Sequence, residues 1–324
     1  MENSRQLKKN SKMKKFVIKR IISLFLVLLG ITLLCFFLLN LSPIDATDAY
    51  IHKHMMPPTE ETVQKIQREL GLNKPLLERY FLWLKNVFTL NLGDSFVTGK
   101  PIAKEIPICF IRTFKVVSGA VIIMLFSSII LGILSFLKKD KICDQIIRAL
   151  TLMGMSIPSY WMGFMLIYLF SIKLNLLPFI FNDTPKAYIL PSISLSIPFI
   201  ATYTRMIRTN ILEKFGEDFV IYAKSRGIPL YKIITKHILK NSSVSLVLLL
   251  GQNIGNILAG TAVIETVFSI KGLGRYGLDA ILSRDNPAIN AYVLIIALSF
   301  ATINLLSDII AMKLDKRVGE NSLL

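Results

Sequence analysis

Two histidines separated by one residue are the clearest candidates for metal chemistry in this chain. The run His52-Lys53-His54-Met55-Met56 lies in a polar stretch between apolar segments. In an extended segment, residues two positions apart point to the same side, so His52 and His54 could converge on one ion while Lys53 points away. Imidazole with thioether beside it suits borderline metals such as nickel or copper. The alternative is an ordinary exposed loop that holds two of the three histidines.

Ionisable residues in the apolar segments are few. Glu265 and Asp308 lie near the ends of two of them, whereas an ion-driven transporter needs paired ionisable groups in mid-membrane. We therefore interpret both as structural. The cysteines Cys35, Cys109 and Cys143 have neither metal-ligand nor disulfide spacing. No Ser-His-Asp or Cys-His pattern and no phosphate-binding G-x-x-x-x-G-K loop occurs, so we expect no catalysis, no cofactor and no ATP binding by this chain.

The composition is that of a membrane protein. Apolar residues make up 53% of the 324 residues, and the mean hydropathy is +0.56, which excludes an ordinary soluble globule. The net charge of +17 alone would fit either nucleic acid or a membrane surface. However, Lys and Arg concentrate in residues 1–20, 138–148, 205–240 and 313–324, which flank the apolar runs. This positive-inside pattern predicts a lipid membrane, and no nucleic acid, as partner.

Six apolar segments have the roughly 20 residues needed to cross a bilayer core. The first is too long for a signal peptide, and no small-residue cleavage site follows it. We predict an all-α protein with six transmembrane helices and both termini in the cytoplasm. The predicted spans are Phe16–Leu41, Thr113–Leu137, Ala149–Ile172, Tyr188 to about Ile207, Val244–Phe268 and Ala288–Met312.

These spans divide the chain into a cytoplasmic tail, a first span, an external insertion, a five-helix core and a second tail. Pro158 should break one hydrogen bond within the third span, which a helix bundle tolerates, and Pro198 should interrupt the fourth. Gly251 and Gly255 form a small-xxx-small face that lets helices approach closely. The boundaries are residues 1–15, 16–41, 42–112, 113–312 and 313–324.

A polar, basic stretch over residues 219–241 lies between the fourth and fifth spans. Apolar residues on one side indicate a helix up to about Arg226 and another from Leu230. Between them, Gly227 offers the left-handed position that ends a helix, and Pro229 suits the first turn of the next. This favours an element that another protein grips. The alternative is an amphipathic helix lying on lipid, but a glycine and a proline in mid-segment disfavour a continuous surface helix.

This stretch resembles the cytoplasmic coupling loop of permease subunits from binding-protein-dependent ABC importers, in the nickel, dipeptide and oligopeptide branch. That branch has Y-V-R-T-A-R-A-K-G, a spacer and H-A-L-R-N. Here F-V-I-Y-A-K-S-R-G stands at 219–227 and H-I-L-K-N at 237–241. The resemblance implies ATPase coupling by the loop over 209–242, and in particular by Phe219, Tyr222, Ala223, Lys224, Arg226, Gly227, His237, Leu239 and Asn241.

Further motifs of the branch recur outside the loop. S-I-P-S-Y-W at 156–161 resembles S-I-P-x-F-W, and N-L-G-D-S at 91–95 resembles D-L-G-x-S. G-L-G-R at 272–275 and R-D-N-P at 284–287 resemble the external W-P-G-L-G-R and N-R-D-Y-P. The resemblance implies roles in translocation or gating for Pro158, Trp161, Glu265, Gly272, Gly274, Arg275 and Asp285.

The resemblance runs from about Phe16 to Arg317 and implies the type I importer fold in the bacterial cytoplasmic membrane. It also implies a complex with a second, similar permease, two ABC ATPase subunits that bind ATP and Mg, and an external substrate-binding protein. Closure of the ATPases would act through the coupling loop and rock the spans outward.

Two cargoes fit this branch. Nickel, free or chelated, is favoured by the short hairpin over 175–190, where dipeptide permeases often carry a long insertion, and by Pro57-Pro58-Thr59. Di- or oligopeptide is the alternative. From a different class, a stand-alone channel or secondary transporter would not need a coupling helix.

Overall fold

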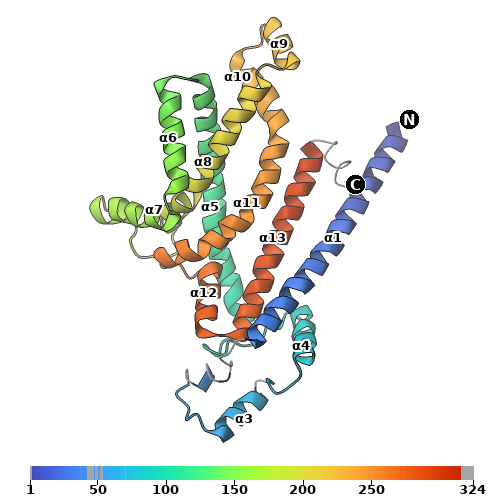
Figure 1. Cartoon of the computed structure of the whole chain (residues 1–324), viewed down its shortest axis with the longest axis vertical. Coiled ribbons are helices and arrows are strands. Elements are labelled where there is room, and N and C mark those ends of the chain that lie inside the picture. Colours follow the sequence, from blue (N-terminus) through green and yellow to red (C-terminus); the bar gives the residue numbers. More distant parts are fainter. Residues whose placement is uncertain (1, 42–46, 48–49, 52–53, 70, 315–324) are drawn as a thin grey trace. The chain divides into compact units, whose positions relative to one another are not determined.

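Most of the described residues are helical in the computed structural model (Figure 1). The structure describes all residues except 1, 42–46, 48–49, 52–53, 70 and 315–324. Within the described residues the only extended pairing is an isolated bridge between Asp94 and Pro101. An all-α fold, as predicted from the apolar segments, is confirmed.

Among the described residues, five helical segments are long and apolar enough to cross a membrane, and a bent pair of helices makes a sixth if it counts as one span. The first lies in α1 (Glu2–Asn40). The second is α5 (Ile102–Leu137) and the last is α13 (Asn286–Leu314). The other two candidate spans are Pro185–Lys214, which contains α8 (Ile189–Lys214), and Leu230–Val267, which contains α11 (Leu239–Val267).

The third predicted span is not the single helix that the sequence suggested. Helix α6 (Ile142–Ser156) and helix α7 (Ser159–Leu166), which continues as the π-helix η1 (Ile167–Lys173), are bent by 106° at the break between them. Pro158 disfavours the helical conformation at the preceding residue, and Ile157 is extended there, with φ −84° and ψ 127°. The proline therefore turns the chain and does more than remove one hydrogen bond.

Pro198 has the opposite outcome. The predicted interruption of the fourth span is wrong, because α8 runs without a break from Ile189 to Lys214. Of the candidate single-helix spans, this one has the largest share of its apolar window buried, 61%. Packing on several sides holds the helix together where the proline removes a backbone donor.

Two predicted boundaries also move. Helix α5 begins at Ile102, so the end of the expected external insertion is already part of the second long helix. At the other end, the second helix of the coupling loop continues without a gap from Leu230 through the π-helix η3 (Ile233–Ile238) into α11. Both helices begin in amphipathic segments. The length of an apolar run predicts only the part of a helix that lies in hydrocarbon, so the sequence did not predict these extensions.

The chain forms two compact units. Unit 1 comprises residues 1–113 and 271–302, with α1, α3 (Glu60–Glu69), α4 (Leu76–Phe88), the start of α5, α12 (Leu273–Ser283) and the start of α13. In its core, side chains from α5, α12 and α13 pack together. Helix α4 is tied to α1 by a hydrogen bond of 3.1 Å between the hydroxyls of Tyr80 and Thr32.

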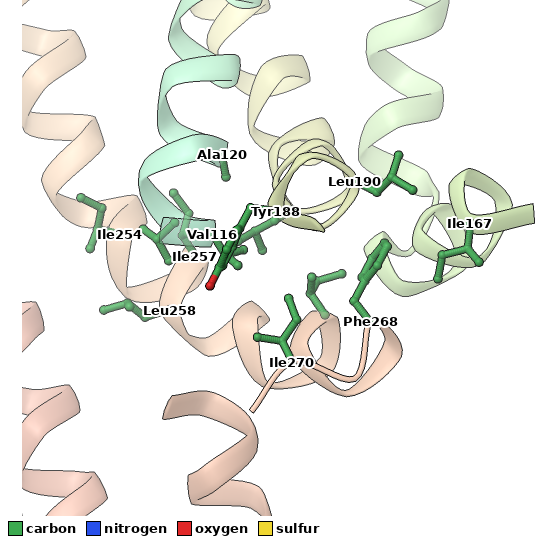
Figure 2. Close-up of a cluster of buried hydrophobic side chains, with 13 residues drawn as sticks. Val116, Ala120, Ile167, Tyr188, Leu190, Ile254, Ile257, Leu258, Phe268 and Ile270 are labelled. Atoms are coloured by element: carbon green, nitrogen blue, oxygen red, sulfur yellow. The ribbon is translucent and has the colours of Figure 1, made fainter. Parts of the chain in front are cut away.

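Unit 2 comprises residues 114–270 and 303–324. Helices α6, α7 and α11 all pack against α8. Figure 2 shows its main core, a cluster that includes Val116 and Ala120 of α5, Leu190 of α8 and Ile257 of α11. A second core cluster lies under the coupling loop.

Close helix packing in unit 2 depends on Gly251. A Cβ atom at this position would lie 2.7 Å from both Cβ and Oγ of Ser307 on α13, closer than real side chains approach. We expect Gly251→Val to destabilise the protein by about 1–3 kcal/mol, since α13 must move away. The thermal midpoint of the purified protein in detergent should fall. Gly216→Ala is the matched control, because a Cβ there meets nothing within 4 Å; equal midpoints for both variants would contradict this packing.

Candidate functional site

The coupling loop (residues 209–242) is a helix, a turn and a helix. Helix α9 (Asp218–Ser225) ends in a turn at Gly227, whose φ is +69°. The N–H of Gly227 donates to the carbonyl of Lys224 at 2.9 Å, and the N–H of Ile228 donates to the carbonyl of Ala223 at 3.1 Å. The predicted left-handed glycine is confirmed, and its bonds satisfy carbonyls at the end of α9. Pro229 then precedes the short helix α10 (Leu230–Lys232).

One face of the loop is buried. Val220 and Ala223 of α9 and three isoleucines of η3 pack on the ends of α5 and α8 in one cluster. Of the residues predicted to couple, only Ala223 belongs to the buried set, while Phe219 and Leu239 pack at its edge. Burying one face in the bundle fixes the loop to the helices that it would have to move. The buried members are Phe136, Ile207, Ile211, Val220, Ala223, Ile233, Ile234 and Ile238.

The opposite face carries exposed aromatic rings and cations. Tyr222 is 63% exposed and Tyr231 is 64% exposed. The ammonium of Lys224 lies 3.6 Å from the ring centroid of Phe215, and the guanidinium of Arg226 lies 5.7 Å from that of Tyr222. Tyrosine and arginine are enriched in protein interfaces, whereas large exposed rings are uncommon on surfaces that contact only water. His237 and Asn241, also predicted to couple, are exposed as well.

A buried carboxylate near the loop was not predicted. Asp144, fully buried in the first turn of α6, accepts hydrogen bonds from Arg208 Nε at 3.0 Å and Arg208 Nη2 at 2.8 Å. It also accepts from the Ser135 hydroxyl at 2.5 Å and the Asp140 backbone N–H at 3.1 Å. Arg148 lies 3.7 Å away. This Asp144 cluster joins the end of α5 and the start of α6 to the last turns of α8, which lead directly into the coupling loop.

The signal for this cluster was present in the sequence. Asp144 is a carboxylate in a stretch of lysines, and it stands four residues before Arg148, a spacing that brings helical side chains together. The sequence alone did not reveal that Arg208, 64 residues further on, is the partner of Asp144.

The predicted gating residues fall in both units. In unit 2, Pro158 and Trp161 flank the sharp bend, and Trp161 is half exposed. Glu265 is fully buried near the end of α11, and its backbone carbonyl accepts the N–H of Ile270 at 2.7 Å. The roles proposed for Glu265, structural or in gating, stay predictions.

In unit 1, Asp285 links two motifs that are far apart in the sequence. Its carboxylate accepts hydrogen bonds from the Ser95 hydroxyl at 2.5 Å and from the backbone N–H of Phe96 at 3.1 Å. It also accepts the N–H of Ala288 at 3.4 Å, in the first turn of α13. Thus the N-L-G-D-S motif of the insertion is held against the start of the last span, a contact through Ser95 that the sequence did not reveal.

The other three predicted gating residues lie at the start of α12. Gly272 is its N-cap and Gly274 is buried in its first turn. The side chain of Arg275 lies 3.7 Å from that of Asp279, one turn further on. The backbone N–H of Leu273 donates to the hydroxyl of Thr113 at 2.7 Å, which anchors this end of α12 on α5.

The histidine pair stays a prediction. His52 lies outside the described residues. The ring of His54 stacks on Tyr50, with centroids 4.1 Å apart, and its Nδ1 lies 2.9 Å from the carbonyl of Tyr50. Among the residues that the structure describes, no group of three or more His, Cys, Asp or Glu is placed to hold a metal.

The candidate membrane spans, together with a connecting loop that has one buried and one exposed face, define a helical membrane protein. The chain belongs to the family "Binding-protein-dependent transport system inner membrane component", which matches residues 128–320. The N-terminal model "Binding-prot-dependent transport system membrane comp, N-term" matches residues 13–102. The protein is thus a multi-pass bacterial inner-membrane permease of an ABC importer.

Relatives that match most of this chain are named for different cargoes. The chain is 35% identical over 311 residues to the metal-staphylopine import system permease protein of Staphylococcus aureus, covering 96% of this chain and 100% of the relative. It is 32% identical over 314 residues to a putative peptide transport system permease protein of Brucella suis, covering 94% and 99%. It is 31% identical over 298 residues to the glutathione transport system permease protein of Pectobacterium atrosepticum, covering 92% and 96%.

We predict that Asp144→Asn destabilises unit 2 by about 3–5 kcal/mol. We expect a value near the lower end of this range, because 17% of the Arg208 side chain stays exposed to solvent. The variant leaves a largely buried guanidinium without its counter-charge. Thermal unfolding in detergent measures the effect. Asp140→Asn is the control, since its side chain is exposed and Asn tolerates its φ of +62°. The double variant Asp144→Leu, Arg208→Leu should recover most of the loss; no recovery would contradict the ion-pair explanation.

We predict that Gly227→Glu uncouples transport while leaving the membrane bundle folded. A Cβ at Gly227 meets no atom within 4 Å, so the cost is the left-handed backbone alone, about 1–2 kcal/mol. That is enough to lower the population of the correct turn by about 5- to 30-fold. ATP hydrolysis stimulated by the loaded binding protein should fall accordingly. Gly216→Glu places the same charge in the same loop without positive φ and serves as control. Wild-type stimulation together with wild-type uptake in Gly227→Glu would refute the prediction.

Proposed function

We propose that the chain forms half of the translocation pathway for nickel, imported as a chelate that an external binding protein delivers. A relative that matches over nearly the whole chain is named for metal-staphylopine import, and this supports a chelated metal over a bare ion. The short segment between η1 and the 3-10 helix η2 (Pro185–Tyr188) agrees with the predicted short hairpin. Import of small peptides is the second candidate, because relatives named for peptide and glutathione transport also match.

The observation that carries the transport mechanism is the two-faced coupling loop. Its buried face packs on α5 and α8, while Tyr222 and Tyr231 point away from that cluster and are exposed. An ATPase subunit that holds the exposed face would move the loop as a unit, since the Gly227 turn is closed by its own hydrogen bonds. The Asp144 cluster would pass this movement to α6. The chain itself contributes no catalytic group; ATP and Mg belong to the partner subunits.

The proposed assembly contains this permease, a second similar permease, two ATPases and an external binding protein. In the proposed topology the bent pair α6–α7 counts as one of six spans, and both termini and the coupling loop lie in the cytoplasm. The insertion over 42–112 and helix α12 then face outward. Alternating access follows if the two permeases rock between inward- and outward-open arrangements when ATP closes the ATPases.

We predict from this topology that a cysteine at position 100 reacts with a membrane-impermeant maleimide in intact cells and that one at position 139 does not. Lys100 and Lys139 are both exposed in the structure, so accessibility depends on the side of the membrane and not on burial. The background must lack Cys35, Cys109 and the exposed Cys143. Position 139 should become reactive after the cells are made permeable. Labelling at 139 in intact cells would overturn the six-span arrangement.

The cargo is tested in a strain that lacks the chromosomal transporter and expresses the complete complex. We expect uptake of radioactive nickel supplied with excess histidine, and little competition by trialanine. Uptake of labelled trialanine without nickel uptake would replace this proposal by peptide import. A His52→Ala, His54→Ala variant in the same assay tests the histidine pair. Reduced uptake at limiting nickel that recovers at high nickel would support a metal site, and unchanged uptake would identify an ordinary loop.

A further inference from the structure

A charged cavity lies in unit 1, where the start of α5 meets the start of α12. Its volume is about 290 Å³, at the lower end of the roughly 300–1,000 Å³ typical of small-molecule sites. In the proposed six-span topology, α12 lies in the external segment that precedes the last span, so the cavity faces outward. The side chains that line it with charge or hydrogen-bonding groups are Glu105, Arg112, Lys271, Arg275, Tyr276 and Asp279.

The charges in the lining are mixed. Arg112, Lys271 and Arg275 are cations, and Glu105 and Asp279 are anions. Arg112 Nη1 donates to the carbonyl of Lys271 at 3.4 Å, which keeps this guanidinium at the wall. The ion pair between Arg275 and Asp279 is long, 3.7 Å, and its partners are 31% and 66% exposed. Such an exposed pair contributes little stability, so a ligand carboxylate can replace Asp279 beside Arg275 at small cost.

Two polar atoms of the lining have no hydrogen-bond partner. These are Oε2 of Glu105 and the hydroxyl of Tyr276, and both atoms are buried. A buried polar atom without a partner destabilises the folded protein, so a ligand group that pairs with it is favoured. Burial raises the pKa of Tyr276, and the nearby Glu105, Asp285 and Cys109 add to the increase. The phenol therefore keeps its proton at neutral pH and is a donor, while Glu105 Oε2 is an acceptor.

The chemistry of this set matches a zwitterion. A carboxylate would bind to Arg275 or Lys271 and accept from the Tyr276 hydroxyl, whereas an ammonium or amine N–H would donate to Glu105. A bare divalent cation would instead meet three positive side chains against two carboxylates. Amines and carboxylates occur together in small peptides and in the nitrogen- and oxygen-donor chelators that hold transition metals.

We propose that this cavity is an outer subsite of the permease that recognises the amino-carboxylate groups of the cargo after the binding protein releases it. The proposal rests on the proposed function, since it names the chemical feature shared by a metal chelate and a peptide. The subsite holds cargo weakly and orients its charged end towards α5 and α12. It thereby adds selection by the permease to selection by the binding protein.

Equilibrium binding to the complete complex tests the subsite without the binding protein. The complex is trapped with ATP and vanadate, and two probes are used, a nickel–histidine chelate and labelled trialanine. Arg275→Gln and Glu105→Gln should each weaken binding by at least about tenfold, as expected for loss of one charged hydrogen bond. Arg275→Lys should retain part of the affinity, since it keeps the charge.

Lys104→Gln is the matched control, because Lys104 precedes Glu105, is exposed and does not line the cavity. Binding that depends on Arg275 and Glu105 but not on Lys104 supports the subsite, and the probe that binds distinguishes chelate from peptide. Equal affinity in all variants overturns it, as does absence of binding to the wild-type complex from cells that import either cargo. Cells that import neither cargo would refute the proposed function instead.

Discussion

A bilayer core offers no hydrogen-bond partner to a peptide group, and this constraint decides how the chain can use its prolines. Pro158 and Pro198 both lie in apolar segments and each removes one donor. Around Pro198 the helix α8 is packed on several sides and stays continuous. At Pro158 the chain turns by 106° into a second helix and a π-helix, so the backbone groups are still bonded locally. The same residue type thus lies within a continuous helix or at a sharp bend, depending on how much protein surrounds it.

Buried charges, like buried peptide groups, need partners, and Asp144 at the other end of unit 2 shows this. A carboxylate buried among helices is tolerated only when its charge and lone pairs are matched, and Asp144 receives hydrogen bonds from Arg208, Ser135 and a backbone N–H. Because these donors come from different elements, the ion pair fixes their relative positions. The apolar cluster under α9 adds a second attachment at the same end of α8. The coupling loop is therefore joined to the bundle both by packing and by charge.

Local chemistry explains which features the sequence could predict. Gly227 was predictable because a left-handed turn between two helical patterns has few other solutions. The apolar spans were predictable because bilayer thickness sets their length. The contacts of Asp144 with Arg208 and of Ser95 with Asp285 were not, since they join residues far apart in the chain. Neither was the difference between the two prolines, which depends on neighbours that only the folded chain supplies.

The π-helix η3 has a consequence for how this loop can evolve. A π-turn holds one more residue than an α-turn over a similar rise, so it absorbs an inserted residue without opening a loop. Removing one residue between Ile233 and Ile238 would restore an ordinary α-helix and leave the segment before it facing nearly the same way relative to α11. Removing one residue from the α-helical part of α11 would instead rotate that segment by about 100° and turn the exposed face of α9 in another direction. The junction can therefore lose one residue without changing the direction of that face, whichever side chains the face carries.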